Sequence, residues 1–318
     1  MSNNDKFKEP YTKTRTETQA FKASEEINEI LHDEESGCYK PWQFIDYNIK
    51  KDTLKTTYDE IVLWGTQEAM IRPGWNVQNK EVTIPNIFSK VIGVHENVKQ
   101  YKNDISTLIQ QENTLFYKKF PMNRKRYPKD MNRVYKSLLD VRGRINKEKL
   151  MTSEHWKYSK LNPVLQNRMA DKIIEFSDIS SFWKYRNFSI KLRMSIINRI
   201  LDFISSLIYD GGRSERIMRI SIFTVLTNLN EDMLNLLQKF DYPMKVPKII
   251  IYNNNNKRNL TFADAVTLMF MNSMGIDIVI YNPTGTSDIE NYVKEENYDI
   301  HRLYETRNSL PFWRFFNW

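Results

Sequence analysis

Two short apolar runs in the C-terminal third constrain the fold of this chain more than any other feature. They lie within Val246–Tyr252 and Asp277–Tyr281, and each is too short to be a buried helix. Such runs are typical of strands that are buried on both faces of a parallel sheet. Between them, Phe262–Ser273 has helical spacing and Gly275 ends it. The sequence therefore predicts a strand–helix–strand unit, the basis of a Rossmann-like layer.

The segment before residue 98 predicts a small arrangement of helix and strand. Thr57–Ile71 has apolar residues at helical spacing. Gly74–Val94 has strand-like stretches, two of them on either side of Asn79 and Lys80. A two-residue polar connection between such stretches is typical of a β-hairpin. We therefore expect a helix, a hairpin and a further strand at Lys90–Val94.

Residues 100–240 predict mainly helices. The strongest candidates are Phe188–Tyr209 and Glu215–Leu229, and Asp210-Gly211-Gly212 between them predicts a helix stop. Asn230 is expected to cap the next helix, because Glu231 and Asp232 follow it in the first turn, where the helix dipole favours acidic residues.

These patterns predict a helix-rich α/β protein with a Rossmann-like layer. The length of 318 residues suggests two or three domains. We divide the chain into a flexible N-terminus (1–20), an α+β part (21–98), a basic connector and helix (99–150), a helical part (151–242) and a Rossmann-like α/β part (243–318).

The composition excludes several classes of protein and site. A single cysteine, Cys38, excludes an intramolecular disulfide and a cysteine-rich zinc site, and the four histidines have no metal-ligand spacing, so we predict no metal. No serine lies in a G-x-S-x-G motif. Charged residues interrupt Ile190–Ile208, the longest apolar stretch, so we expect no membrane span. Since no signal peptide is recognisable either, we predict a cytoplasmic protein.

The positive charge of the chain is concentrated in one segment. The formal net charge is +8, but Lys99–Leu150 holds 14 Lys and Arg against 5 Asp and Glu, so the rest of the chain sums to −1. The residues of a predicted basic surface are Lys118, Lys119, Arg124, Lys125, Arg126 and Lys129. After them, Val134, Leu138, Leu139, Val141 and Ile145 follow a rough helical spacing.

Two interpretations of this basic segment stay open. In one, it binds phosphates, and Phe120 and Tyr127 stack on the bases of a single-stranded nucleic acid. In the other, it is a solvated face or a connector between domains. Nucleic acid is the less favoured ligand, because no RRM, KH or zinc-finger signature accompanies the charge.

The turn after the second predicted strand is the best candidate for a ligand site. In open α/β sheets, ligands bind at the carboxyl ends of the strands. Ser287 and Glu290 match a capping box, so a helix with free first-turn amides is expected there, and Gly285 would permit close approach. The predicted ligand-binding residues are Asn282, Pro283, Thr284, Gly285, Ser287, Asp288 and Glu290, with Lys248 from the preceding strand.

Two observations count against a simple phosphate site at this turn. Asp288 and Glu290 would repel a bare phosphate unless a cation or ribose hydroxyls intervene. Neither G-x-G-x-x-G nor G-x-x-x-x-G-K-[ST] occurs in the chain. The alternative is a well-capped structural helix. Lys40, His95 and Lys248 are secondary candidates that depend on the fold bringing them to this turn, and Lys248 at a solvated strand end is the alternative for that residue.

Several blocks of the sequence are similar to a known family. Asp277–Val293 resembles the signature of the YceG-like family, and Tyr39–Phe44, Ile84–Glu96 and Phe240–Lys248 resemble further family segments. These proteins are components of a "biosynthetic module" in bacterial tellurium-resistance and stress operons. The resemblance implies a cytoplasmic stress-response protein whose partners are proteins of the same operon, and it supplies no catalytic residue.

The leading hypothesis is a stress-response protein that binds an anionic, nucleotide-like, phosphorylated metabolite near Asn282–Glu290, as a group-transfer enzyme. The alternative is a non-enzymatic protein that binds nucleic acid or an acidic partner through residues 118–149. The sequence identifies neither a cofactor nor the reaction.

Overall fold

The computed structural model describes residue 22 and residues 47–306, with gaps at 124–126, 179–182, 184–209, 241–243 and 255–259. Several predicted features lie outside the described residues: Cys38, Lys40, the helix Phe188–Tyr209, and the basic residues Arg124, Lys125 and Arg126.

The predicted strand–helix–strand unit forms the centre of a five-stranded parallel sheet. Its strands lie in the order β5 (Thr114–Tyr117), β6 (Lys248–Tyr252), β7 (Asp277–Asn282), β4 (Phe88–Ile92) and β8 (Asp299–Arg302). Every residue of β6 and β7 is buried, which explains their uninterrupted apolar character. Helix α10 (Phe262–Ser273) joins these two strands, so this prediction and the α/β fold class are confirmed.

A second, smaller sheet has the strand order β1 (Asn48–Thr53), β3 (Glu81–Asn86) and β2 (Asn76–Gln78). The predicted hairpin joins β2 to β3, and its turn residues Asn79 and Lys80 have φ values of 50° and 59°. Positive φ at both positions is the mark of a type I′ turn.

Strand β3 leads through Ile87 directly into β4, and so links the two sheets. The backbone N–H of Ile87 donates to the carboxylate of Asp277 (2.8 Å), and the Ile87 carbonyl accepts from the N–H of Ile278 (2.7 Å). Strand β4 therefore pairs with β7, although the two lie in different predicted parts of the chain. The five-stranded sheet thus crosses the predicted boundaries.

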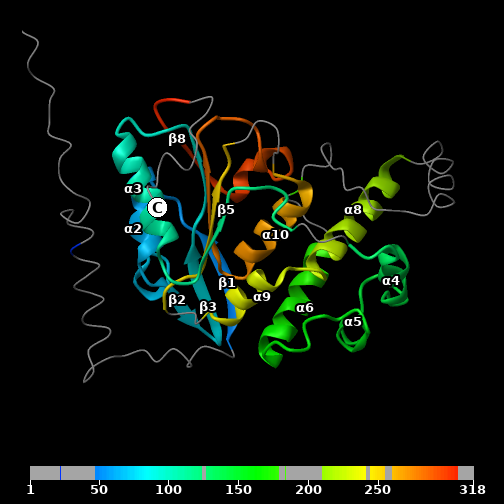
Figure 1. Ribbon diagram of the computed structural model, residues 1–318. Coiled ribbons are helices and arrows are strands. Elements are labelled where there is room, and N and C mark those ends of the chain that lie inside the picture. The colour runs from blue at the N-terminus through cyan, green and yellow to red at the C-terminus, as the bar shows by residue number, and fades with distance from the viewer. Residues whose placement is uncertain are drawn as a thin grey trace, which may run out of the picture.

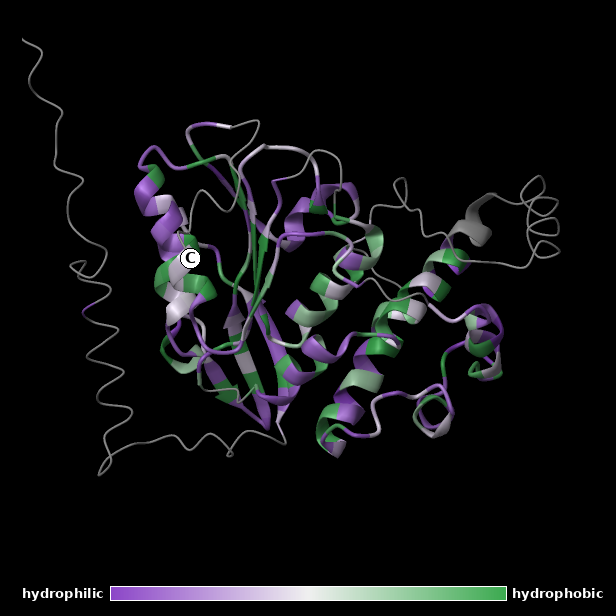
Figure 2. Cartoon of the chain, in the orientation of Figure 1, coloured by the Kyte–Doolittle hydropathy of each residue, from purple (hydrophilic) through white to green (hydrophobic). Residues whose placement is uncertain are grey.

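One face of the large sheet is covered by α2 (Tyr58–Thr66) and α3 (Val98–Ile109), and the short helix η3 (Ala69–Ile71) follows α2 (Figure 1). Thr57 begins α2 with the capping box that it forms with Glu60. The side chains of this core are buried and apolar: Ile61, Val62, Ile87, Val91, Val94, Tyr101, Ile105, Leu108, Ile250, Tyr252, Val279 and Tyr281. Figure 2 shows the central strands as mainly hydrophobic.

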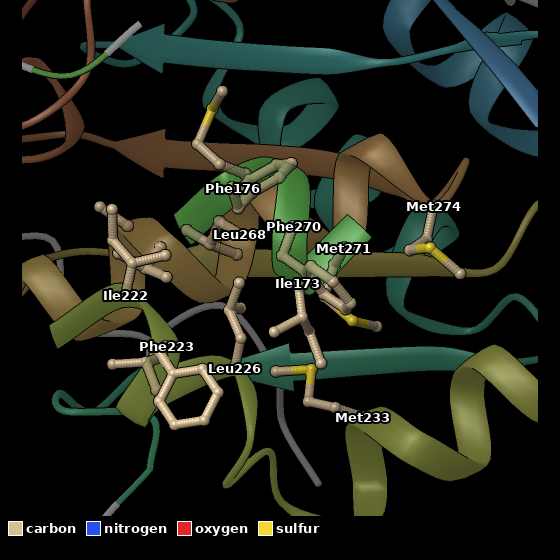
Figure 3. Close-up of a cluster of buried hydrophobic side chains, with 14 of the residues drawn as sticks. Ile173, Phe176, Ile222, Phe223, Leu226, Met233, Leu268, Phe270, Met271 and Met274 are labelled. Carbon is tan, nitrogen blue, oxygen red and sulfur yellow. The ribbon is translucent and has the colours of Figure 1, made fainter. Parts of the chain in front are cut away.

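The other face is covered by α10, with α6 (Pro163–Asp178) and α8 (Asp210–Leu226) packed against it. Figure 3 shows this core. Its labelled residues are nine from α6, α8, α9 (Glu231–Gln238) and α10, and Met274 just after α10: Ile173, Phe176, Ile222, Phe223, Leu226, Met233, Leu268, Phe270, Met271 and Met274. The small helices α4 (Met131–Ser137) and α5 (Lys147–Thr152) lie on the far side of α6 and α8 from the sheet (Figure 1).

Some local predictions in the middle of the chain are confirmed and others are wrong. Asn230 caps α9 as predicted, since its side chain accepts from the N–H of Met233. Thr114–Tyr117, however, forms the edge strand β5 within the region predicted to be helical. Helix α8 begins at Asp210, so Gly211 and Gly212 lie in its first turn instead of before it. Within the described residues, no helix is both long and apolar enough to cross a membrane.

Candidate functional site

The carboxyl ends of the parallel strands meet at one edge of the large sheet. Strands β4 and β7 are neighbours, and after them the chain continues on opposite faces of the sheet. Helix α3 after β4 packs into the core beneath α2, whereas Ile289 and Val293 after β7 pack into the core beneath α10. Such a topological switch point is where open α/β sheets place their ligands.

A buried charge cluster lies at this switch point. Lys90 of β4 is 1% exposed, and its ammonium nitrogen lies 2.7 Å from the carboxylate of Asp288 and 2.6 Å from that of Glu290. The Asp288 side chain is fully buried, whereas that of Glu290 is 22% exposed. Since one positive charge faces two negative charges, the cluster has a formal charge of −1.

Two asparagines complete the surroundings of Asp288. The side-chain amides of Asn253, after β6, and Asn282, at the end of β7, donate to its Oδ2 at 3.1 and 2.6 Å. Burial raises the pKa of Asp288, and the charge of Lys90 opposes this. Burial also acts to raise the pKa of Glu290, but the hydrogen bonds and charge of Lys90 outweigh it, so that pKa is lowered. Asp288 therefore holds the loop together.

The predicted capping by Ser287 is wrong. The chain forms a short 3₁₀ helix, η5 (Ile289–Asn291), whose cap is Asp288, and the side chain of Asp288 accepts from the N–H of Ile289. Glu290 binds the N–H of Asp288, and Ser287 is exposed. The long-range partners of Asp288 outweigh the local capping pattern. With only one turn present, the row of free amides expected for a phosphate does not form.

Gly285 permits a close approach, but the approaching group belongs to this chain. A Cβ on Gly285 would lie 2.9 Å from Thr306 Cγ2, and one on Gly93 would lie 2.6 Å from the Glu305 backbone oxygen. The N–H of Val94 donates to the same Glu305 oxygen (2.7 Å). The segment Leu303–Thr306, which we name the strap, therefore crosses the ends of β4 and β7.

The predicted ligand-binding residues of the β7 loop fall into two groups. Asn282, Pro283 and Asp288 are buried and hold the loop. The exposed or partly exposed residues are Thr284, Gly285, Ser287 and Glu290. The second group, with the neighbouring Thr286, is the part of the loop that a ligand can reach from solvent.

The predicted basic surface, which starts at Lys118, begins at the same edge of the sheet. Lys118 and Lys119 follow β5 directly and are exposed. The chain is then fixed, because the N–H of Met122 donates to the buried carboxylate of Asp264 at the start of α10 (2.7 Å). Phe120 is 3% exposed, so it cannot stack on a base as predicted.

A family model of the YceG domain matches residues 55–314 of this sequence. The chain belongs to the YceG family. It is 36% identical over 289 residues to the uncharacterised protein YceG of Bacillus subtilis (strain 168). The alignment covers 91% of this chain and 49% of that protein, so the chain spans about half the length of its curated relative. No solved structure matches the sequence significantly.

The matched YceG region includes the five-stranded sheet and every loop of its carboxyl edge, whereas β1 of the smaller sheet lies before it. The charge cluster around Lys90 and the start of the basic segment are therefore parts of a YceG domain and not of an appended segment.

In this YceG domain, Lys248 lies at the amino ends of the parallel strands, opposite the carboxyl edge. It begins β6 and pairs in register with Asp277, the first residue of β7, whereas Asn282 ends β7. Its side chain is buried and donates to the carbonyl of Val246 (2.9 Å), so the prediction of a solvated rim lysine is wrong. Burial lowers the pKa of Lys248 to about 8. The fold does not bring Lys248 to the β7 loop.

His95 lies at the carboxyl edge, in the loop after β4. Its ring stacks on Tyr58, with 5.5 Å between the ring centroids, and its Nδ1 accepts from the N–H of Asn97. These contacts place His95 beside α2, whereas the β7 loop packs its Ile289 under α10. Lys129 is exposed at the start of α4, in the outer helical layer.

Sequence reasoning missed two residues of this YceG site, Lys90 and Asn253. The sequence did carry one indication that Lys90 has a special role: it is a charged residue in the middle of a strand whose other residues are uncharged. Asn253 belongs to a run of asparagines, and nothing local distinguishes it. In the part of the chain that the structure describes, no group of three or more His, Cys, Asp or Glu could hold a metal ion.

Proposed function

We propose that this YceG-family protein binds an anionic, nucleotide-like metabolite at the carboxyl edge of its parallel sheet. The observation that carries the proposal is the juxtaposition of two unlike loops at that edge. The loop after β5 presents the exposed cations Lys118 and Lys119, and the loop after β7 presents the carboxylate of Glu290 with neighbouring hydroxyls. A ligand with phosphate at one end and hydroxyl groups at the other matches both loops.

The spacing of the strands supports a ligand of nucleotide size. Strands β5 and β7 are separated only by β6. Since neighbouring strands lie about 4.8 Å apart, the two loops begin on the order of 10 Å from each other. A single inorganic phosphate would not span that distance.

The charges determine the orientation of the proposed ligand. The carboxylates around Lys90 repel a phosphate but accept hydrogen bonds from hydroxyl groups. Thr284 and Thr286, whose hydroxyls lie 3.0 Å apart, extend this hydroxyl-binding side. The phosphate therefore lies toward Lys118 and Lys119, and the sugar toward the β7 loop.

We also propose a class of reaction and a biological setting for this protein. We assign the protein to group transfer, in which Glu290 is the carboxylate nearest to solvent at the site. The setting, a biosynthetic module of bacterial tellurium-resistance and stress operons with partners from the same operon, rests on the family resemblance. Cytoplasmic localisation belongs to the same proposal.

Thermal-shift measurements test ligand binding directly. We expect stabilisation by at least one member of a panel of nucleoside phosphates and nucleotide-sugars, tested with and without Mg²⁺. The double variant Lys118→Glu/Lys119→Glu should lose that stabilisation. The control Arg142→Glu/Arg144→Glu, which reverses two charges near α4 and α5, should keep it. Absence of stabilisation by every member of the panel would refute the proposal.

The alternative function, binding of nucleic acid or an acidic partner through the whole of residues 118–149, stays a prediction. The structure divides that segment between the sheet edge and the outer layer of α4 and α5 (Figure 1). Salt-dependent retention on single-stranded DNA that is lost on reversal of Arg124, Lys125 and Arg126 would favour this alternative.

A further inference from the structure

The turn between α4 and α5 presents an apolar side chain to solvent. Val141 is 104% exposed, and among the described residues only Tyr304 is a comparably exposed large hydrophobic residue. The sequence placed Val141 on a helical apolar stripe, but α4 ends at Ser137. Leu138 and Ile145 on either side are buried. The chain therefore turns Val141 outward between two anchored residues.

Hydrogen bonds fix the shape of this turn. The N–H of Asp140 donates to the carbonyl of Arg144 (2.7 Å), and the N–H of Gly143 donates to the carbonyl of Asp140 (3.0 Å). The Asp140 carboxylate accepts from the N–H groups of Arg142 (2.8 Å) and Arg144 (2.9 Å). The hydrogen bond from Arg144 is the main cause of the lowered pKa of Asp140. A turn that is already ordered loses little conformational entropy when it binds a partner.

Three exposed cations lie close to Val141 in the sequence. Arg142 follows it and Arg144 lies three positions on, where its Nε is 3.8 Å from the carboxylate of Asp140. Lys149 is exposed as well, and its ammonium group lies 3.3 Å from the carbonyl of Leu139, at the base of the turn. We name Val141, Arg142, Arg144 and Lys149 the turn surface. Single exposed apolar residues are common on proteins, but this one lies in a hydrogen-bonded turn that also presents exposed cations.

We propose that the turn surface binds an acidic segment of another protein, with Val141 inserted among apolar side chains and the three cations paired with carboxylates. A protein fits this surface better than a nucleic acid, because valine has no ring to stack on bases. The two aromatic residues predicted to stack on bases do not lie there either, since Phe120 and Tyr127 pack into or against the core. The turn surface also lies across α6 and α8 from the sheet edge, so it acts independently of the proposed ligand site (Figure 1).

Two labelled peptides of equal length and charge test this surface on the full chain by fluorescence anisotropy. One alternates Glu with Leu and the other alternates Glu with Ser. We expect tighter binding of the Glu/Leu peptide at moderate salt. Val141→Ser should weaken that peptide about tenfold, as expected for loss of a buried valine contact, and should leave the Glu/Ser peptide unchanged.

Further variants separate this surface from the ligand site. Arg142→Glu/Arg144→Glu should abolish binding of both peptides, whereas Lys118→Glu/Lys119→Glu should not change it. Because these side chains are exposed, circular dichroism should show every variant folded. Equal binding of the Glu/Leu peptide by Val141→Ser and the unsubstituted protein would overturn the proposal. So would tighter binding of a single-stranded oligonucleotide that depends on Arg142 and Arg144 but not on Val141.

Discussion

The ammonium group of Lys90 is the residue-scale feature on which the candidate site depends. It neutralises a fully buried carboxylate, Asp288, and binds Glu290 at the same time. Asn253 and Asn282 hold Asp288 from the other side. Three segments that are distant in the chain, at Lys90, Asn253 and the β7 loop, are thus joined through one carboxylate, and the shape of the β7 loop follows from that contact.

Replacing Lys90 with methionine should destabilise the protein strongly. Removal of one partner of a buried ion pair costs about 3–5 kcal/mol, because the other charge stays buried without compensation. We expect a loss of that size in the free energy of unfolding measured with urea. Glu290→Gln is the matched control, since it leaves the Lys90–Asp288 pair intact and should cost clearly less. Equal losses in the two variants would show that the pair does not hold the loop.

Lys248 should make stability depend on pH in the alkaline range. Its pKa is about 8 in the folded protein and near 10.5 when it is exposed in the unfolded chain. Below about pH 8 the folded protein buries a charged ammonium group, which lowers the free energy of unfolding. Between the two pKa values the folded protein buries a neutral amine, so this loss of stability decreases as the pH rises. The free energy of unfolding should therefore rise relative to that of Lys248→Met, by at most about 1.4 kcal/mol per pH unit. Urea titrations of both proteins across this range measure the difference, and a constant difference would contradict the prediction.

At the scale of elements, the local sequence predicted what local interactions decide. The strand–helix–strand unit, the turn at Asn79 and Lys80 and the cap at Asn230 all depend on neighbouring residues, and all are present. The edge strand β5 was missed because its four residues are only half-buried, and their pairing with β6 is what makes them a strand.

The candidate site was predictable only in part, for the same reason. Its place after β7 followed from the strand pattern and the rule for open α/β sheets. The role of Ser287 was predicted wrongly because Lys90 of β4 and Asn253 after β6 bind Asp288. These residues are distant in the chain, so no local capping pattern contains them. Lys248 was grouped with the loop because sequence order alone does not show that it begins its strand at the opposite edge.

The strap across β4 and β7 should depend on the absence of a side chain at Gly93. Gly93 has a φ of 88°, and a Cβ there would lie 2.6 Å from a backbone oxygen of the strap. Gly143 is a matched control, with a φ of 76° and no atom within 4 Å of its Cβ position. Both alanine variants carry the strain of positive φ, about 1 kcal/mol, but only Gly93→Ala must also displace the strap. Urea denaturation should show a clearly larger loss of unfolding free energy for Gly93→Ala than for Gly143→Ala. Equal losses would mean that the strap can move away from Gly93 at no cost in stability.

At the scale of the whole molecule, the strand order separates two surfaces. It gathers the ends of β4, β5, β6 and β7 at one edge, where the basic segment begins and the β7 loop ends in carboxylates. The remainder of the basic segment continues beyond α6 and α8 to the turn surface (Figure 1). One locally basic stretch of sequence thus contributes to two sites that face different partners.

Hydrogen exchange of the full chain, with and without the most stabilising nucleotide or nucleotide-sugar of the panel, locates the bound ligand. We predict slower exchange at the carboxyl edge, in the peptides that contain Lys118–Met122 and Asn282–Glu290. We predict no change around Lys248 at the amino ends of the strands or around Val141 at the turn surface. Protection at either of these two places, with none at the carboxyl edge, would mean that the ligand binds elsewhere on the molecule.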